Sequence, residues 1–150
     1  MRLYFFCLIQ LLIVFPISNV FAGDRELVTF EIVGFEIPKP LTNQPGDPLN
    51  GKRIVTDNTN ATCLICHSMP IPEQPNHGNL APDLNGVGSK FTAGELRLRL
   101  VNPKAFNPET IMPAYYRISG LTMVQGKYLG ETIYSAQDIE DAIAYLLSLN

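Results

Sequence analysis

Three side chains with the chemistry to bind a cofactor stand together near the middle of the chain. The run Cys63-Leu64-Ile65-Cys66-His67 has the spacing C-x-x-C-H, which is the attachment signature of c-type haem. Two thiols about one helical turn apart can add to the two vinyl groups on one edge of a porphyrin, and the adjacent imidazole then becomes the proximal ligand of the iron. We therefore predict that Cys63 and Cys66 hold one haem c covalently and that His67 coordinates its iron.

Two other interpretations of the cysteine pair are weaker. A redox-active C-x-x-C dithiol does not need His67, and its usual setting between a strand and a helix is missing from the flanking sequence. A zinc site needs a fourth ligand, for which only His77 is available.

The first 22 residues have the pattern of a secretory signal peptide. One basic residue, Arg2, precedes an apolar run over 3–17, and Val20 and Ala22 suit cleavage after Ala22. The run is shorter than the ~20 residues of a membrane-spanning helix, which favours a cleaved signal over an anchor. Cys7 lies inside the run rather than at its end, which disfavours lipid attachment there. We expect a periplasmic protein with no membrane anchor in the mature chain.

Length and composition limit the number of domains and the expected classes of partner. A chain of 150 residues suits a single domain. Its 14 acidic and 11 basic residues include no basic run, so nucleic acid is not an expected partner. Loss of the signal would leave Cys63 and Cys66 as the two cysteines, both used for attachment, so we expect no catalytic nucleophile in this chain.

Capping residues predict three helices. Asp47-Pro48 begins one over roughly 48–56. Thr92 and Glu95 form a capping box for a second helix, which Asn102-Pro103 ends. The alternation in 96–100 would also suit a strand, but caps at both ends favour the helix. The third helix starts at a box over 135–138, and its apolar face comprises Ile139, Ala142, Ile143, Leu146 and Leu147.

The segments between these helices are expected to be mostly irregular. Residues 23–48 are a proline-rich, extended arm with a weak strand signal over 28–32. Residues 68–90 and 103–134 are predicted to be loops. The stretch 81–86 contains Pro-x-Leu-x-Gly, and we predict that the carbonyl oxygen of Pro82 accepts a hydrogen bond from the proximal imidazole. An ordinary proline turn is the alternative.

The distal ligand of the iron has several candidates. Met112 is favoured because it lies between two prolines, and a thioether is a weak donor that a rigid loop must hold in place. His77 would instead give a bis-imidazole haem of lower potential. Met123 lies in a looser stretch with glycine and is expected to serve in packing, and an open position is a further alternative. Met69 is too close to His67 to reach the opposite face.

These motifs follow the class-I cytochrome c plan, and the chain resembles the SoxX family, the small monohaem subunit of the sulfur-oxidising SoxAX cytochrome complex. The likeness extends over about 37–149 and rests on residues 37–42, 45–48, 51–55, 63–73, 77–78, 82–89 and 107–117. It implies a mostly α fold with three to four helices around a covalent haem, long ordered loops, an extended arm at 23–48 and a cytochrome domain at 49–150.

The resemblance also implies a role in electron transfer. In SoxAX the SoxA subunit carries a haem with a cysteine-persulfide ligand, where thiosulfate is joined oxidatively to a cysteine of the carrier protein SoxYZ. This L-cysteine S-thiosulfotransferase reaction releases two electrons. The SoxX subunit, bound to SoxA as a heterodimer, takes them on its His/Met haem and passes them to a soluble cytochrome c.

Two other functions share some of these residues. A free periplasmic electron carrier would have the same haem site without an enzymatic partner. A haem-based ligand binder or peroxidase would need an open distal position. For a complex, the composition of 114–117 suits an interface, although Tyr115 and Tyr116 could instead wall the haem. The arm at 23–48 is a second interface candidate.

Overall fold

The computed structural model describes residues 27–150, so the expected signal peptide at 1–22, its cleavage site and Cys7 lie outside the described residues. The described part is mostly helical and contains no strand, only an isolated antiparallel bridge between Val33 and Glu36. None of its helices is both long and apolar enough to cross a membrane. Its four α-helices are α1 (Pro48–Val55), α2 (Ala93–Val101), α3 (Pro103–Phe106) and α4 (Ala136–Ser148), and its three 3-10 turns are Cys63–Ile65, Val87–Ser89 and Gly126–Tyr128.

The helices α1, α2 and α4 begin where the capping residues predicted. The Asp47 side chain accepts a hydrogen bond of 2.9 Å from the backbone N–H of Leu49, and Pro48 occupies the first turn of α1. Helices α2 and α4 each begin with a capping box, in which a hydroxyl and a later acidic side chain bond to each other's backbone N–H. The two boxes are Thr92 with Glu95 and Ser135 with Asp138.

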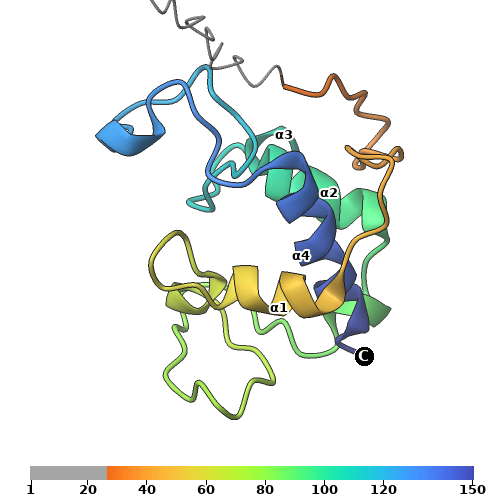
Figure 1. Cartoon of the computed structure of the whole chain (residues 1–150), viewed down its shortest axis with the longest axis vertical. Helices are drawn as coiled ribbons and strands as arrows, with labels where there is room; N and C mark the ends of the chain where they lie inside the picture. The colour runs from red at the N-terminus through yellow and green to blue at the C-terminus, as the bar shows by residue number, and fades with distance from the viewer. Residues whose placement is uncertain (1–26) are drawn as a thin grey trace, which may run out of the picture.

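Helix α1 lies across α4, and the two backbones approach closely (Figure 1). A Cβ atom added at Gly51 would lie 2.0 Å from the carbonyl oxygen of Asp141, and one at Gly46 would lie 2.2 Å from that of Glu140. Only glycine fits at these two positions, because a Cβ there would meet rigid backbone. The largest fully buried side chains of the surrounding core are Ile37, Val55, Leu98, Val101 and Ile139.

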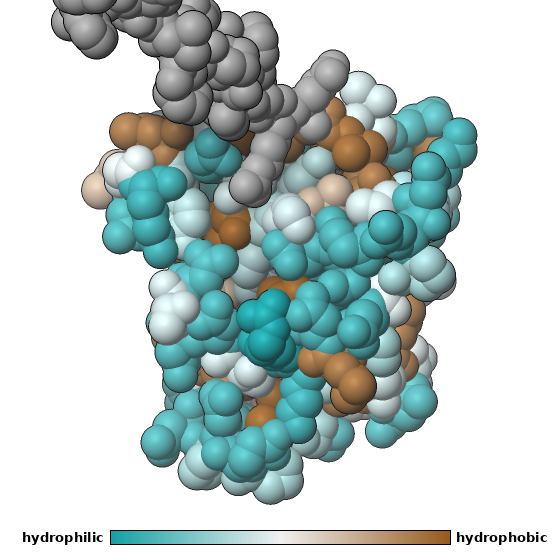
Figure 2. Space-filling model, viewed as in Figure 1, coloured by the Kyte–Doolittle hydropathy of each residue, from teal (hydrophilic) through white to brown (hydrophobic). Residues whose placement is uncertain are grey.

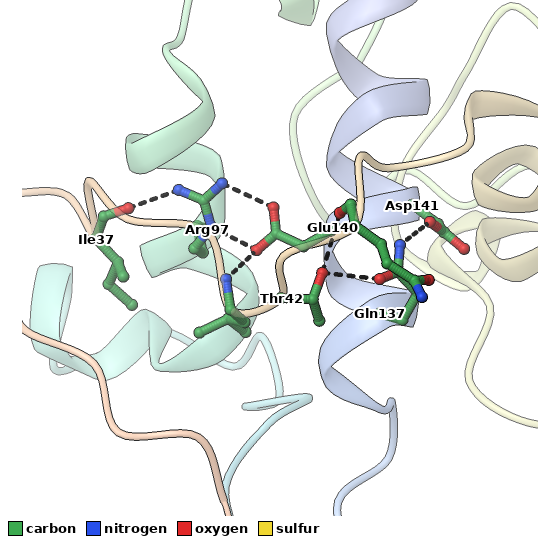
Figure 3. Close-up of polar contacts among 8 residues, drawn as sticks. Ile37, Thr42, Arg97, Gln137, Glu140 and Asp141 are labelled. Atoms are coloured by element: carbon green, nitrogen blue, oxygen red, sulfur yellow. Dashed lines mark hydrogen bonds and ion pairs between the residues drawn. The ribbon is translucent and has the colours of Figure 1, made fainter.

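A buried ion pair ties the N-terminal arm to α2 and α4 (Figure 3). Arg97 of α2 donates from Nε and Nη2 to the two carboxylate oxygens of Glu140 of α4, at 2.7 and 2.8 Å. The same guanidinium donates from Nη1 to the Ile37 carbonyl at 2.6 Å, and the Leu41 N–H donates to Glu140 at 2.8 Å. The arm therefore supplies one acceptor and one donor to the pair and is fixed against both helices.

Two expectations for the loops are wrong. Residues 28–32 form no strand, because the chain turns back at Gly34 (φ +60°) and pairs only through the single bridge. Pro103 ends α2 as predicted but then starts the short helix α3, since its fixed φ suits a first helical position.

The face in Figure 2 is mainly hydrophilic, with its apolar residues in separate patches.

Candidate functional site

The C-x-x-C-H motif forms a tight turn that brings its three reactive side chains to one cavity. The Leu64 N–H donates to the Thr62 hydroxyl at 3.2 Å and starts the 3-10 turn Cys63–Ile65. The backbone N–H groups of Cys66 and His67 both donate to the Cys63 carbonyl, at 3.1 and 2.9 Å. As a result Cys63, Cys66 and His67 all line a cavity of about 330 Å³.

A hydrogen bond to Pro82, in the loop after the motif, holds the imidazole of His67 in place. Its Nδ1 lies 2.7 Å from the carbonyl oxygen of Pro82. A carbonyl can only accept, so Nδ1 carries the proton and Nε2 is left with a free lone pair, the form that binds a metal. Backbone bonds from Ala81 to Cys66 and from Leu84 to Ser68, both 3.0 Å, fix Pro82 relative to the motif.

Met112 lines the same cavity from the loop that follows α3. It lines the cavity together with His67 and the cysteines, and it also lines an adjoining cavity of about 90 Å³ that shares Cys63, His67, Met112 and Tyr115 with the first. The Met112 N–H donates to the Thr110 hydroxyl at 3.1 Å, and the Tyr115 N–H donates to the Leu100 carbonyl at 2.9 Å. The loop is thus fixed on both sides of the methionine.

The other candidates for a distal ligand lie elsewhere. His77 lines neither cavity, and its Nδ1 accepts a hydrogen bond of 3.1 Å from the Met69 N–H. Met69 is buried in the core. Met123 is fully exposed (102%), so the expectation that it serves in packing is wrong. Its backbone has φ +56°.

The electrostatics of the cavity favour neutral side chains. Burial raises the pKa of the Cys63 thiol to about 12, although the neighbouring Tyr115 lowers it slightly. A redox dithiol needs an accessible thiolate, so this environment suits it poorly. Burial likewise raises the pKa values of Tyr115 and Tyr134, whose rings stack at 4.6 Å. Among residues 27–150, no group of three or more His, Cys, Asp or Glu side chains is placed to hold a metal ion.

The tyrosines of 114–117 belong to the interior. Tyr115 and Tyr116 are both 5% exposed, and Tyr115 lines both cavities. The Tyr116 hydroxyl accepts a hydrogen bond of 3.0 Å from the Val28 N–H and so fastens the arm. The sequence left two roles open for these tyrosines, an interface or a wall of the cofactor cavity. Their burial favours the second role for Tyr115, which lines both cavities.

The donor set and the walls of the two cavities fit a covalently attached haem. Two thiols, an imidazole with a free Nε2 and a thioether converge on a space with apolar walls, as a porphyrin with two axial ligands requires. The apolar lining of the inner cavity comprises Leu84, Val87, Phe91, Leu96, Leu100 and Leu146.

Comparison with known proteins identifies the family. The structure is similar to the crystal structure of SoxXA from P. pantotrophus, with a TM-score of 0.72 and 33% sequence identity, over 80% of this chain and 93% of that one. This chain belongs to the SoxX family. No family model matches it, and no curated protein matches it. Membership in the SoxX family confirms the predicted class, a mostly α cytochrome c fold, and supports haem, electron transfer and sulfur oxidation as its chemistry.

Sequence reasoning missed two charged residues of the site. Glu109 lines the cavity of about 330 Å³. Arg99 of α2 lines the inner cavity. The helix that contains Arg99 was predicted from its caps, but the alternation of Leu and Arg over 96–100 does not show which of these side chains face a cofactor.

Proposed function

We propose that this chain is the haem-bearing, electron-transfer subunit of a thiosulfate-oxidising complex of the SoxAX type. The observation that carries the proposal is the convergence of Cys63, Cys66, His67 and Met112 on one cavity. In this role the chain has no catalytic residue of its own and acts by accepting and releasing electrons.

Each residue of the cavity has a distinct part in holding the cofactor. Cys63 and Cys66 would form the two thioether bonds, and His67 would coordinate the iron through Nε2. Pro82 keeps the proton on Nδ1 and so fixes the tautomer that can coordinate. Met112 would coordinate from the opposite face. A haem bound in this way supplies a one-electron couple at its iron, and its thioether ligand raises the reduction potential.

Two side-chain ligands leave no coordination position for a substrate, so the chemistry on sulfur has to take place on another chain. That division fits the cysteine content, because Cys63 and Cys66 are the two cysteines of the described residues and both would be used for attachment. The proposed partners are a SoxA-type subunit in a heterodimer, a SoxYZ-type carrier protein reached through the complex, and a downstream soluble cytochrome c. The proposed site of action is the periplasm, after cleavage behind Ala22.

The test is to produce the full chain together with its SoxA-type partner in a host that matures c-type cytochromes. We expect the two chains to co-purify in equal amounts, with one haem on this chain. Addition of thiosulfate and the carrier protein should then reduce that haem.

A matched control replaces both attachment cysteines, Cys63→Ser with Cys66→Ser, and should abolish the haem band of this chain. A monomer that carries haem but neither binds the partner nor is reduced by thiosulfate and the carrier would contradict the proposal. That result would favour a free electron carrier.

A further inference from the structure

Besides His67, two acidic or basic side chains line the candidate haem cavities, one in each cavity, and their charges have opposite signs. Glu109 lines the outer cavity, and Arg99 lines the inner one. The outer cavity also contains Cys66, which does not line the inner cavity. Arg99 and Cys66 therefore line different cavities, whereas Cys63, the other attachment residue, lines both.

Aromatic rings hold the Arg99 guanidinium in place. Its Cζ lies 4.1 Å from the ring centroid of Phe91 and 4.3 Å from that of Phe106. Nη1 donates to the Glu95 carbonyl at 2.9 Å. This is the one hydrogen bond of the guanidinium to the described residues, so most of its five N–H donors remain available.

The charge of Arg99 has no carboxylate partner within residues 27–150. The closest acidic residue in sequence, Glu95, uses its carboxylate in the capping box, where it accepts from the Thr92 N–H at 2.8 Å. The neighbouring Arg97 is different, since both of its terminal donors are met by Glu140 and Ile37. Arg99 is half-buried, and burial lowers its pKa while Glu95 only partly offsets this. A partly desolvated cation of this kind is stabilised by a nearby anion.

We propose that Arg99 binds a carboxylate of the haem. The inference rests on the proposed function, because it requires attachment through Cys63 and Cys66. The vinyl groups and the two propionate carboxylates of haem lie on opposite edges of the ring. Attachment at Cys66 places that part of the vinyl edge in the outer cavity, and Cys63 lies where the two cavities meet. The inner cavity, which Arg99 lines, is then left for the part of the ring that lies farther from Cys66. A guanidinium also matches a carboxylate in shape, through two parallel hydrogen bonds.

This contact predicts how the reduction potential depends on pH. A cation beside a carboxylate lowers the pKa of that carboxylate by about one to three pH units. With Arg99 present, the carboxylate stays ionised from pH 5 to 8, and the potential should be nearly constant over this range. Without Arg99, the pKa of the carboxylate rises. An ionised carboxylate favours the ferric form, so the potential should then fall as pH increases through the shifted pKa.

The experiment measures the midpoint potential of the haem-loaded full chain from pH 4 to 9 in the wild type, Arg99→Leu and Arg99→Lys. Arg53→Leu is the control, because it removes an exposed guanidinium of α1 that bonds to Asn50. We expect the step in potential to move up by about one to three pH units in Arg99→Leu. We expect little change in Arg99→Lys, which keeps the charge, and none in the control.

Three results would overturn the assignment. The first is an Arg99→Leu profile that matches the wild type, even if that variant is less stable, because Arg99 would then serve only to pack the phenylalanines. The second is a step in Arg99→Lys as large as in Arg99→Leu. The third needs no variant: wild-type haem carboxylates that both titrate near neutral pH in infrared difference spectra. A wild-type chain that binds no covalent haem would instead refute the proposed function.

Discussion

The buried pair of Arg97 and Glu140 makes a quantitative prediction about stability. Their side chains are only 3% and 7% exposed, and the carboxylate accepts from two guanidinium nitrogens and from the Leu41 N–H. Arg97→Met would leave the buried carboxylate with one hydrogen bond and no counter-charge. Removal of one partner of a buried pair costs about 3–5 kcal/mol. The total stability of a domain is about 5–15 kcal/mol, so this single change should remove a large fraction of it.

The double variant distinguishes a coupled pair from two independent sites. Arg97→Met with Glu140→Leu removes both charges, which is often tolerated when apolar side chains fill the space. The double variant still leaves the Leu41 N–H and the Ile37 carbonyl without their hydrogen-bond partners (Figure 3). We therefore expect the double variant to lose about 2–3 kcal/mol less than the sum of the two single variants.

The assay is urea unfolding of the haem-loaded protein followed by far-ultraviolet circular dichroism, with the single and double variants compared at constant slope. Lys52→Met with Glu73→Leu is the matched control, since it removes an ion pair whose side chains are 40% and 56% exposed, and it should change stability little. The coupling would be refuted if the stability loss of the double variant equalled the sum of the losses of the two single variants to within about 0.5 kcal/mol.

Two further stability predictions follow from the crossing of α1 and α4. Gly51→Ala places a Cβ 2.0 Å from the Asp141 carbonyl and requires the helices to separate by about 1 Å to reach the 3.0 Å limit of real contacts. We expect a net loss of about 1–3 kcal/mol in thermal unfolding despite the better helix propensity of alanine, whereas Gly126→Ala, with no atom within 4 Å, should change little. Burial by itself would raise the pKa of Asp141, but hydrogen bonds from Asn50, Asp47 and Gln137 outweigh it and hold that pKa below its ordinary value. The ionised Asp141 carboxylate therefore stabilises the fold above pH ~4, and this stabilisation is lost as pH falls through the lowered pKa. The difference in unfolding free energy between wild type and Asp141→Asn should narrow on acidification. A difference that stays constant with pH would contradict this.

Local signals in the sequence were sufficient to predict three of the four α-helices of the described residues. Caps such as Thr92 and Ser135 act within one turn, so their effect can be read from neighbouring residues. The short helix α3 was missed because Pro103 can both end one helix and begin another, and only the surrounding packing decides between these roles.

Contacts between distant segments could not be predicted in the same way. Arg97 and Glu140 are far apart in sequence, and each looks like an exposed charge until the helices pack. Tyr115 and Tyr116 have a composition that suits either an interface or a core, and the structure places both in the core. The C-x-x-C-H motif could be recognised from its spacing alone, and the structure brings its three side chains to one cavity.

The ligand set of the proposed haem has a direct spectroscopic test. A methionine ligand gives the oxidised protein a weak sulfur-to-iron charge-transfer band in the far-red region. We expect this band in the wild type and in Met123→Ala, whose methionine is fully exposed. Met112→Ala should lose the band, and its reduced form should gain the ability to bind carbon monoxide. A band that survives in Met112→Ala, or a reduced wild type that binds carbon monoxide without displacement of a ligand, would contradict the proposed electron-transfer site.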